Sequence, residues 1–267
     1  MSSTAERVAI VTDSTSDLPP EICERYEIVR VPLNVMIDGQ TWQDGVMSQE
    51  EFFERMGAAK DLPTTSQPSV GTFVDAYTEV LKRASHVVSI HISDDLSGTI
   101  ASAHAAAERF AGTVSVFDSR NLSWGLGFQV IEAARAALEG LSAEAVLQRA
   151  ASVRDRVEMI VGLDTLDNLV RGGRVGRVAG FVGGILNLKV TLTVLDGVFE
   201  PVARTRGAKA ALDHTVDWVA ERMGGAKRGA FCVMHALSEE RAKRIAEMIA
   251  ERFEATEMHV VPVGSVI

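Results

Sequence analysis

Cysteine is nearly absent from this sequence of 267 residues, which contains only Cys23 and Cys232. These two residues lie far apart and match neither a zinc-ligand spacing nor a disulfide framework, which argues against a disulfide-stabilised secreted domain. Long apolar runs are absent as well, because no window approaches the roughly 18 uninterrupted apolar residues that a spanning helix needs. The N-terminus carries no apolar signal core. We therefore predict a cytoplasmic protein and leave transient contact with a membrane open.

Positive charge is also scarce, with 27 lysines and arginines against 36 aspartates and glutamates and a net charge of -9. This balance argues against general nucleic-acid binding. The sequence has no Walker A loop, no GxGxxG motif after a strand and no G-x-S-x-G nucleophile elbow. The histidines show no metal-ligand spacing, and the adjacent Asp94 and Asp95 are weak evidence for a metal by themselves. We predict no cofactor, no metal and no nucleic-acid partner.

What the sequence does contain is an alternation of strand and helix patterns in its first half. Apolar, β-branched runs over residues 8–12, 87–92 and 113–117 predict buried strands, and helical patterns follow them. This order is typical of a parallel sheet with helices on both faces. We predict an N-terminal parallel-sheet α/β/α domain over residues 1–155.

The second half follows a different pattern. Asp196 and Gly197 separate two β-rich runs, which is a strong hairpin signal. Further helices and strands alternate after the hairpin. We therefore predict a second domain over residues 156–267, with a mixed sheet, helices and a hairpin, so that the whole chain is a two-domain α/β protein.

The stretch from Val87 to Arg109 predicts a buried strand, a tight polar loop and an alanine-rich helix. Ser97 is placed to cap that helix. A helix N-terminus has unpaired N–H groups and partial positive charge, so it favours an anion. We expect a small anionic group to bind at Ser97, whereas an ordinary capped loop is the alternative.

Two further features favour a ligand site near Ser97. Polar pairs follow three predicted strands, at Asp13-Ser14, Ser93-Asp94 and Asp118-Ser119, and the ends of parallel strands meet at one edge of a sheet. Two prolines bracket the polar loop Thr64–Gln67, which stiffens it. A stiff loop suits hydroxyl groups that must point in a fixed direction, although a simple connection between helices explains it as well.

The centre of the chain is basic, although the whole is acidic. The charged residues between residues 171 and 189 are all cationic, and a second group of cations follows the hairpin. The members of the two groups are Arg171, Arg174, Arg177, Lys189, Arg204, Arg206 and Lys209. Such a segment fits an anionic ligand or an acidic partner, or else is a solvated face with helix-dipole pairing.

Taken together, these loops resemble the DegV family of bacterial fatty-acid-binding proteins over nearly the whole chain. Each motif is weak alone, but their order and spacing are specific. The motifs are Thr12–Pro19, Val31-Pro32-Leu33, Thr65–Ser69, Ile92-Ser93, Leu96–Thr99 with Ser102-Ala103, Asp118-Ser119, Gly172-Gly173-Arg174 and Arg204-Thr205.

The resemblance implies two α/β domains with a long-chain fatty acid such as palmitate bound non-covalently between them. It implies that hydroxyl groups hold the carboxylate, here those of Thr65 and Ser97. Arg174 looks like part of the head-group network by the same resemblance. The full set of ligand-binding candidates is Thr65, Ser97, Ser66, Gly98, Thr99, Arg174, Ser93 and Ser14.

The resemblance further implies a role without catalysis by this chain. Some family members present the carboxylate to an ATP-dependent fatty-acid kinase, which makes an acyl phosphate for phospholipid synthesis. Arg204 or Arg206 looks like the docking residue for that kinase. We expect a carrier protein whose only bound group is its fatty acid.

Other interpretations remain open. The family usually continues into an H-x-G-P-G-like segment whose histidine lies near the head group, whereas this sequence ends at Ile267. The alternative functions are a hydrolase or acyltransferase that uses Ser97 as nucleophile with His91 or another residue as base, and a carrier of another anionic lipid or small acid.

Overall fold

The computed structural model describes residues 7–174, 176, 178 and 188–267. The chain divides into two compact units, Met1–Val157 with Gly264–Ile267, and Glu158–Val263. The sequence interpretation assigned residues 156–267 to the second domain, whereas in the structure the last four residues pack with the first unit.

A four-stranded parallel sheet forms the centre of unit 1, in the order β2-β1-β6-β7. Its strands are β1 (Val8–Asp13), β2 (Val29–Val31), β6 (His86–His91) and β7 (Val114–Asp118). The chain passes from β1 to β2 on one side and places β6 and β7 on the other. The order therefore reverses between β1 and β6, and such switch points are where open α/β sheets bind ligands.

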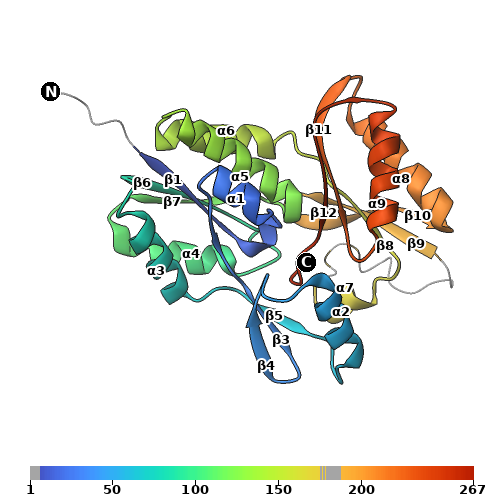
Figure 1. Cartoon of the computed structure of the whole chain (residues 1–267), viewed down its shortest axis with the longest axis horizontal. Helices are drawn as coiled ribbons and strands as arrows, with labels where there is room; N and C mark the ends of the chain where they lie inside the picture. The colour runs from blue at the N-terminus through green and yellow to red at the C-terminus, as the bar shows by residue number, and fades with distance from the viewer. Residues whose placement is uncertain (1–6, 175, 177, 179–187) are drawn as a thin grey trace. The chain divides into compact units, whose positions relative to one another are not determined.

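Helices cover both faces of this sheet, as Figure 1 shows: α3 (Val70–Val80) and α4 (Thr99–Ala107) on one, α5 (Ser123–Leu138) and α6 (Ala143–Arg154) on the other. The α3–α4 face packs into one core that includes Phe73. The α/β/α arrangement predicted from the sequence is confirmed. The remaining short helices of unit 1 are η1 (Ser14–Ser16), α1 (Pro20–Arg25) and η2 (Glu108–Phe110).

A small antiparallel sheet, in the order β4-β3-β5, is the main feature of unit 1 that the sequence did not reveal. It consists of β3 (Asn34–Ile37), β4 (Gln40–Gln43) and β5 (Thr64–Ser66), with α2 (Gln49–Ala58) packed nearby. The strands have only three or four residues, and β5 is polar and lies between prolines, so no alternating pattern marks it.

Unit 2 contains the predicted hairpin of β9 (Leu188–Leu195) and β10 (Val198–Arg206), with φ positive at both turn residues. β8 (Ile160–Leu163) joins them in an antiparallel sheet, and β11 (Arg228–His235) pairs in parallel with β12 (Glu254–Pro262). The strands thus divide between two sheets among the described residues. The helices are α7 (Asp167–Arg171), α8 (Ala208–Arg222) and α9 (Glu239–Ala250).

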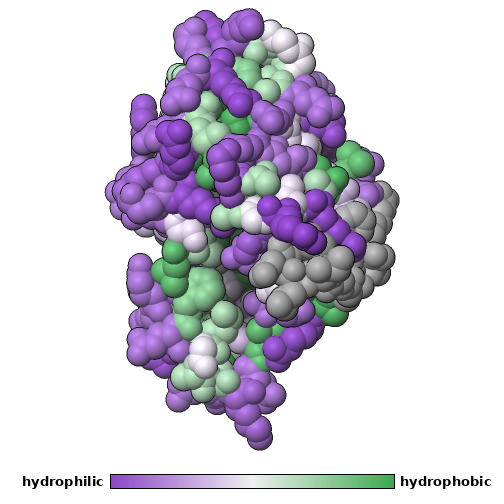
Figure 2. Space-filling view, turned by 90° about the vertical axis from the view of Figure 1, so that its right-hand side faces the viewer, coloured by the Kyte–Doolittle hydropathy of each residue, from purple (hydrophilic) through white to green (hydrophobic). Residues whose placement is uncertain are grey.

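Figure 2 shows one face on which hydrophilic side chains are interspersed with smaller hydrophobic areas. The large hydrophobic side chains that are exposed among the described residues are Val46, Leu138, Val170, Leu195, Leu237 and Ile267. Within the part of the chain that the structure describes, no helix is long and apolar enough to cross a membrane.

The last four residues are attached to unit 1 through two buried carboxylates. The N–H of Gly264 donates to Asp17 Oδ1 at 2.9 Å, and Ser265 Oγ donates to Asp44 Oδ1 at 3.0 Å. Val266 packs against the hydrophobic cluster of Val35, Ile37 and Phe52. A Cβ on Gly264 would lie 2.7 Å from Asp17 Oδ1 and 3.4 Å from Asp44 Oδ2, so this position requires glycine.

We expect Gly264→Ala to lower the free energy of unfolding by about 1–3 kcal/mol, the usual cost of overpacking. Asp17 cannot move aside because it is buried and hydrogen-bonded. Urea denaturation measures the change. Gly57→Ala is the matched control, because Gly57 lies in α2 and nothing is within 4 Å of a Cβ built at that position. This variant should leave the free energy of unfolding unchanged or raise it slightly.

Candidate functional site

Two loops of unit 1 that carry hydroxyl groups lie against each other. A Cβ built on Gly98 would be 2.6 Å from Nε2 of Gln67, so the loop after β6 approaches the loop after β5 closely. Glycine at position 98 permits that approach because it has no side chain. The structure thus brings together the Thr65 and Ser97 loops, which the sequence separates by more than thirty residues.

The Ser97 loop is fixed by its own backbone. The N–H of Ser97 donates to Ser93 O at 3.1 Å. Ser97 Oγ lies 2.9 Å from Thr99 Oγ1 and accepts the Thr99 N–H at 3.4 Å. Gly98, rather than Ser97, occupies the N-cap position of α4, so Ser97 precedes the helix by one residue more than expected. Its half-buried hydroxyl lies beside the N-terminal turn, where an anion is favoured.

The Thr65 loop is held by the small sheet. Thr65 pairs with Val35 of β3, and Ser66 pairs with Asn34, whose Nδ2 donates to Ser66 Oγ at 3.4 Å. Neighbouring side chains of a strand point to opposite faces, so Thr65 faces away from this contact. Among the described residues, the Thr65 hydroxyl has no hydrogen-bond partner, and the side chain is half-buried. Of the two site candidates on this strand, Thr65 is therefore the one whose hydroxyl is available to a ligand, whereas that of Ser66 interacts with Asn34.

Three of the predicted site residues are buried and make hydrogen bonds inside unit 1. Ser14 is buried, and its Oγ accepts the N–H of Leu33 at 3.0 Å. Ser93 is fully buried, and its Oγ accepts the N–H of Asp95 at 3.3 Å. Thr99 is fully buried beside Ser97. These contacts shape the loops around the two partly exposed hydroxyls of Thr65 and Ser97.

The predicted convergence of the three strand ends is confirmed. The N–H of Ser93 donates to Asn121 O at 2.9 Å, and the N–H of Ser119 donates to His91 O at 3.1 Å. Burial raises the pKa of Asp118, and the nearby carboxylate of Asp94 adds to that rise. The N–H of Ile92 also donates to Asp13 Oδ2 at 3.0 Å, so the ends of β1, β6 and β7 lie together at one edge of the sheet.

His91, a candidate base in the sequence analysis, has both ring nitrogens occupied inside the core. Its Nδ1 lies 2.9 Å from Asp13 Oδ2, and its Nε2 lies 2.6 Å from Ser89 Oγ. All three side chains are fully buried. His91 therefore belongs to an internal network and is not a partner of Ser97.

Asp17 is a titratable group that sequence reasoning did not single out. Burial raises its pKa to about 7, although hydrogen bonds from Ser123 and Gly264 oppose the shift. Ser123 Oγ lies 2.5 Å from Asp17 Oδ2. The signal in the sequence was an aspartate that directly precedes an apolar Leu-Pro pair in the loop after β1.

The predicted cations lie in unit 2. Arg174 is exposed, and its Nη1 donates to Gly172 O at 2.5 Å. Arg204 and Arg206 are exposed on β10, separated by one residue and therefore on the same face of that strand. Arg177 lies outside the described residues.

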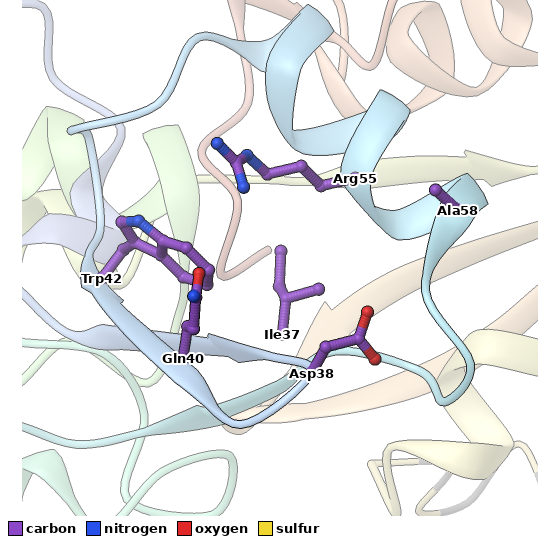
Figure 3. Close-up of a pocket in the computed structure, with 6 residues that line it drawn as sticks. All are labelled: Ile37, Asp38, Gln40, Trp42, Arg55 and Ala58. Atoms are coloured by element: carbon purple, nitrogen blue, oxygen red, sulfur yellow. The ribbon is translucent and has the colours of Figure 1, made fainter.

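A separate cavity of about 290 Å³ lies between the β3–β4 hairpin and α2 (Figure 3). Ile37, Asp38, Gln40 and Trp42 line it from the hairpin side, and Arg55 and Ala58 from the helix. The guanidinium of Arg55 lies 5.2 Å from the centre of the Trp42 ring and also pairs with Glu51. None of the predicted site residues lines this cavity. The part of the chain described by the structure contains no cluster of three potential metal ligands.

The family model described as "Uncharacterised protein, DegV family" matches residues 7–267. A DegV domain-containing protein of Deinococcus radiodurans is 39% identical over 96% of this chain and 90% of its own length. A solved DegV family protein of Thermus thermophilus, described by its fatty-acid binding, is 37% identical with a TM-score of 0.92, covering 97% of this chain and 94% of its own.

A second solved relative is DegV of Bacillus subtilis, described as a fatty acid binding protein. It is 31% identical with a TM-score of 0.88, and the match covers 98% of this chain and 94% of that one. The resemblance and the α/β fold inferred from the sequence are both confirmed by these matches. This chain belongs to the DegV family.

Proposed function

We propose that this chain binds a long-chain fatty acid non-covalently and that Thr65 and Ser97 hold its carboxylate. The observation that carries the proposal is the contact between their two loops at the carboxyl edge of the sheet. Two relatives at 31% and 37% identity, which are described as binding fatty acids, support the class of ligand.

The chemistry of the loops suits a carboxylate. Hydroxyl groups donate to its oxygens without burying a second charge, and hydrogen bonds to ionised groups are among the stronger ones. The N-terminal turn of α4 adds partial positive charge beside Ser97. Burial of the acyl chain contributes roughly 0.8 kcal/mol per methylene before the costs of binding are subtracted.

We further propose that the protein is a carrier that offers the carboxylate to an ATP-dependent kinase. In that reaction a carboxylate oxygen attacks the γ-phosphorus of ATP, the new P–O bond forms, and ADP leaves with the electron pair of the broken bond. Ser97 lies beside Thr99 and has no base among the described residues, which disfavours a serine hydrolase.

The direct test is to remove lipid from the purified protein and titrate it with palmitate by calorimetry. The proposal predicts one saturable site per chain. Failure to bind any long-chain fatty acid would contradict it, and preference for another anionic lipid would favour the second carrier hypothesis.

We expect Arg204→Glu to leave fatty-acid affinity unchanged and to reduce acyl-phosphate formation by a fatty-acid kinase at least tenfold. The residue is exposed on β10, and reversal of a docking charge changes association with a partner by roughly 1–3 kcal/mol. Lys227→Glu changes the net charge by the same amount at an exposed position outside β10, and is the control for charge alone. Loss of lipid affinity together with kinase activity would show that Arg204 belongs to the lipid pocket.

A further inference from the structure

A chain of four buried side chains crosses the core of unit 1. Tyr77 OH lies 2.9 Å from Ser89 Oγ, Ser89 Oγ lies 2.6 Å from His91 Nε2, and His91 Nδ1 lies 2.9 Å from Asp13 Oδ2. All four residues have no exposed surface. A fully buried polar network is costly unless every member is satisfied, so it calls for an explanation.

The contacts give the chain one direction. Oδ2 of Asp13 accepts the N–H of Ile92, so the Nδ1–H of His91, which lies against the same oxygen, is a donor to it. In the neutral imidazole this leaves Nε2 to accept from Ser89 Oγ, which in turn accepts from the Tyr77 hydroxyl. Both oxygens of Asp13 act as acceptors, because Oδ2 also accepts the N–H of Ile92 at 3.0 Å and Oδ1 accepts that of Thr15 at 3.0 Å.

One end of this chain lies on the helix that follows the Thr65 loop, and the other contacts the strand end that precedes the Ser97 loop. Tyr77 is on α3, which begins at Val70, immediately after the loop that carries Thr65. Asp13 binds the backbone of Ile92, the residue before Ser93, and Ser93 O accepts the N–H of Ser97 at 3.1 Å. The chain therefore joins the helix after one loop to the start of the other.

We infer that Tyr77, Ser89, His91 and Asp13 form a positioning network that fixes the Thr65 loop relative to the Ser97 loop. These residues are positioning residues, because they have no exposed surface with which to contact a ligand. The inference rests on the proposed function for its effect on affinity, but its effect on the loops is independent of any ligand.

The test combines fatty-acid affinity with amide hydrogen exchange of the lipid-free protein. Ser89→Ala breaks the network at its middle. We expect a dissociation constant raised about tenfold, the equivalent of about 1.4 kcal/mol, and faster exchange at residues 64–67 and 92–98. Val80→Ala is the control, because it creates a cavity in the same core but removes none of the hydrogen bonds of the network.

Variants at the two ends separate positioning from general loss of stability. Tyr77→Phe removes one hydroxyl and should speed exchange chiefly at residues 64–67. Asp13→Asn places a donor against donors and should speed exchange chiefly at residues 92–98. Should Asp13→Asn fail to fold, Tyr77→Phe and Ser89→Ala still carry the test.

The inference is wrong if Ser89→Ala and Val80→Ala, compared at equal stability, show the same affinity and the same loop exchange. Absence of fatty-acid binding in the unmodified protein is a different result. It would contradict the proposed function, while the exchange pattern would still decide whether the network positions the loops.

Discussion

Ser97→Ala is expected to raise the dissociation constant for palmitate about 10- to 100-fold while leaving the fold intact. A hydrogen bond to an ionised group contributes about 1.5–3 kcal/mol, and the alanine variant loses that donor to the carboxylate. The side chain is half-buried and its other contacts are within its own loop, to Thr99, so little stability should be lost. Calorimetric titration of the lipid-free variant measures the effect.

Thr65→Val tests the partner loop, because valine keeps the branched shape and removes only the hydroxyl. We expect Thr65→Val to lose a similar amount of affinity for palmitate. In the double variant with Ser97→Ala, the loss should be smaller than the sum of the two single losses, because both hydroxyl groups hold the same carboxylate. Ser66→Ala is the matched control, because its hydroxyl already interacts with Asn34. Unchanged affinity in both Ser97→Ala and Thr65→Val would place the head group elsewhere.

Asp17→Asn is expected to stabilise the protein at pH 8 and to flatten the dependence of its stability on pH. Burial raises the pKa of Asp17 from 3.8 to about 7, so the folded protein holds a proton there that the unfolded chain releases. Stability from this group is therefore fully present below pH 3.8 and is lost as pH rises towards 7. The difference corresponds to about 4 kcal/mol at most.

Asparagine resembles the protonated acid. Its oxygen can accept the N–H of Gly264, while its amide donates to Ser123 Oγ. Urea denaturation at pH 5, 6, 7 and 8 measures the effect, with Asp61→Asn as an exposed control that should follow the unmodified protein. Parallel pH curves for Asp17→Asn and the unmodified protein would show that Asp17 is charged throughout this range.

Much of the fold could be predicted from local patterns. Buried strands such as β1 and β6 carry continuous apolar runs, and capping signals mark helix starts such as Ser48 and Ser142. The β3–β4–β5 sheet was missed because its strands are short and because cross-strand pairing, not local pattern, defines them. The return of Gly264 to unit 1 depends on a contact 247 residues away, which no local signal reports.

The candidate site could also be predicted only in part from the sequence. The polar ends of parallel strands must meet at one edge, so Ser14, Ser93 and Asp118 could be placed from the sequence. The sequence could not predict which hydroxyl groups remain available to a ligand. Their availability depends on hydrogen-bond partners in the folded chain, such as Leu33 for Ser14 and Asn34 for Ser66. His91 could be considered as a base because the sequence does not show its contacts with Asp13 and Ser89. Those contacts arise from the pairing of β1 with β6 in the folded chain.

Mass spectrometry of the purified protein, first native and then denatured, tests the central claim most directly. We predict an excess mass equal to a long-chain fatty acid in the native spectrum, which disappears on denaturation. An excess that survives denaturation would indicate a covalent acyl-enzyme. A protein that carries no excess, and that takes up no fatty acid when it is offered one, would contradict the account.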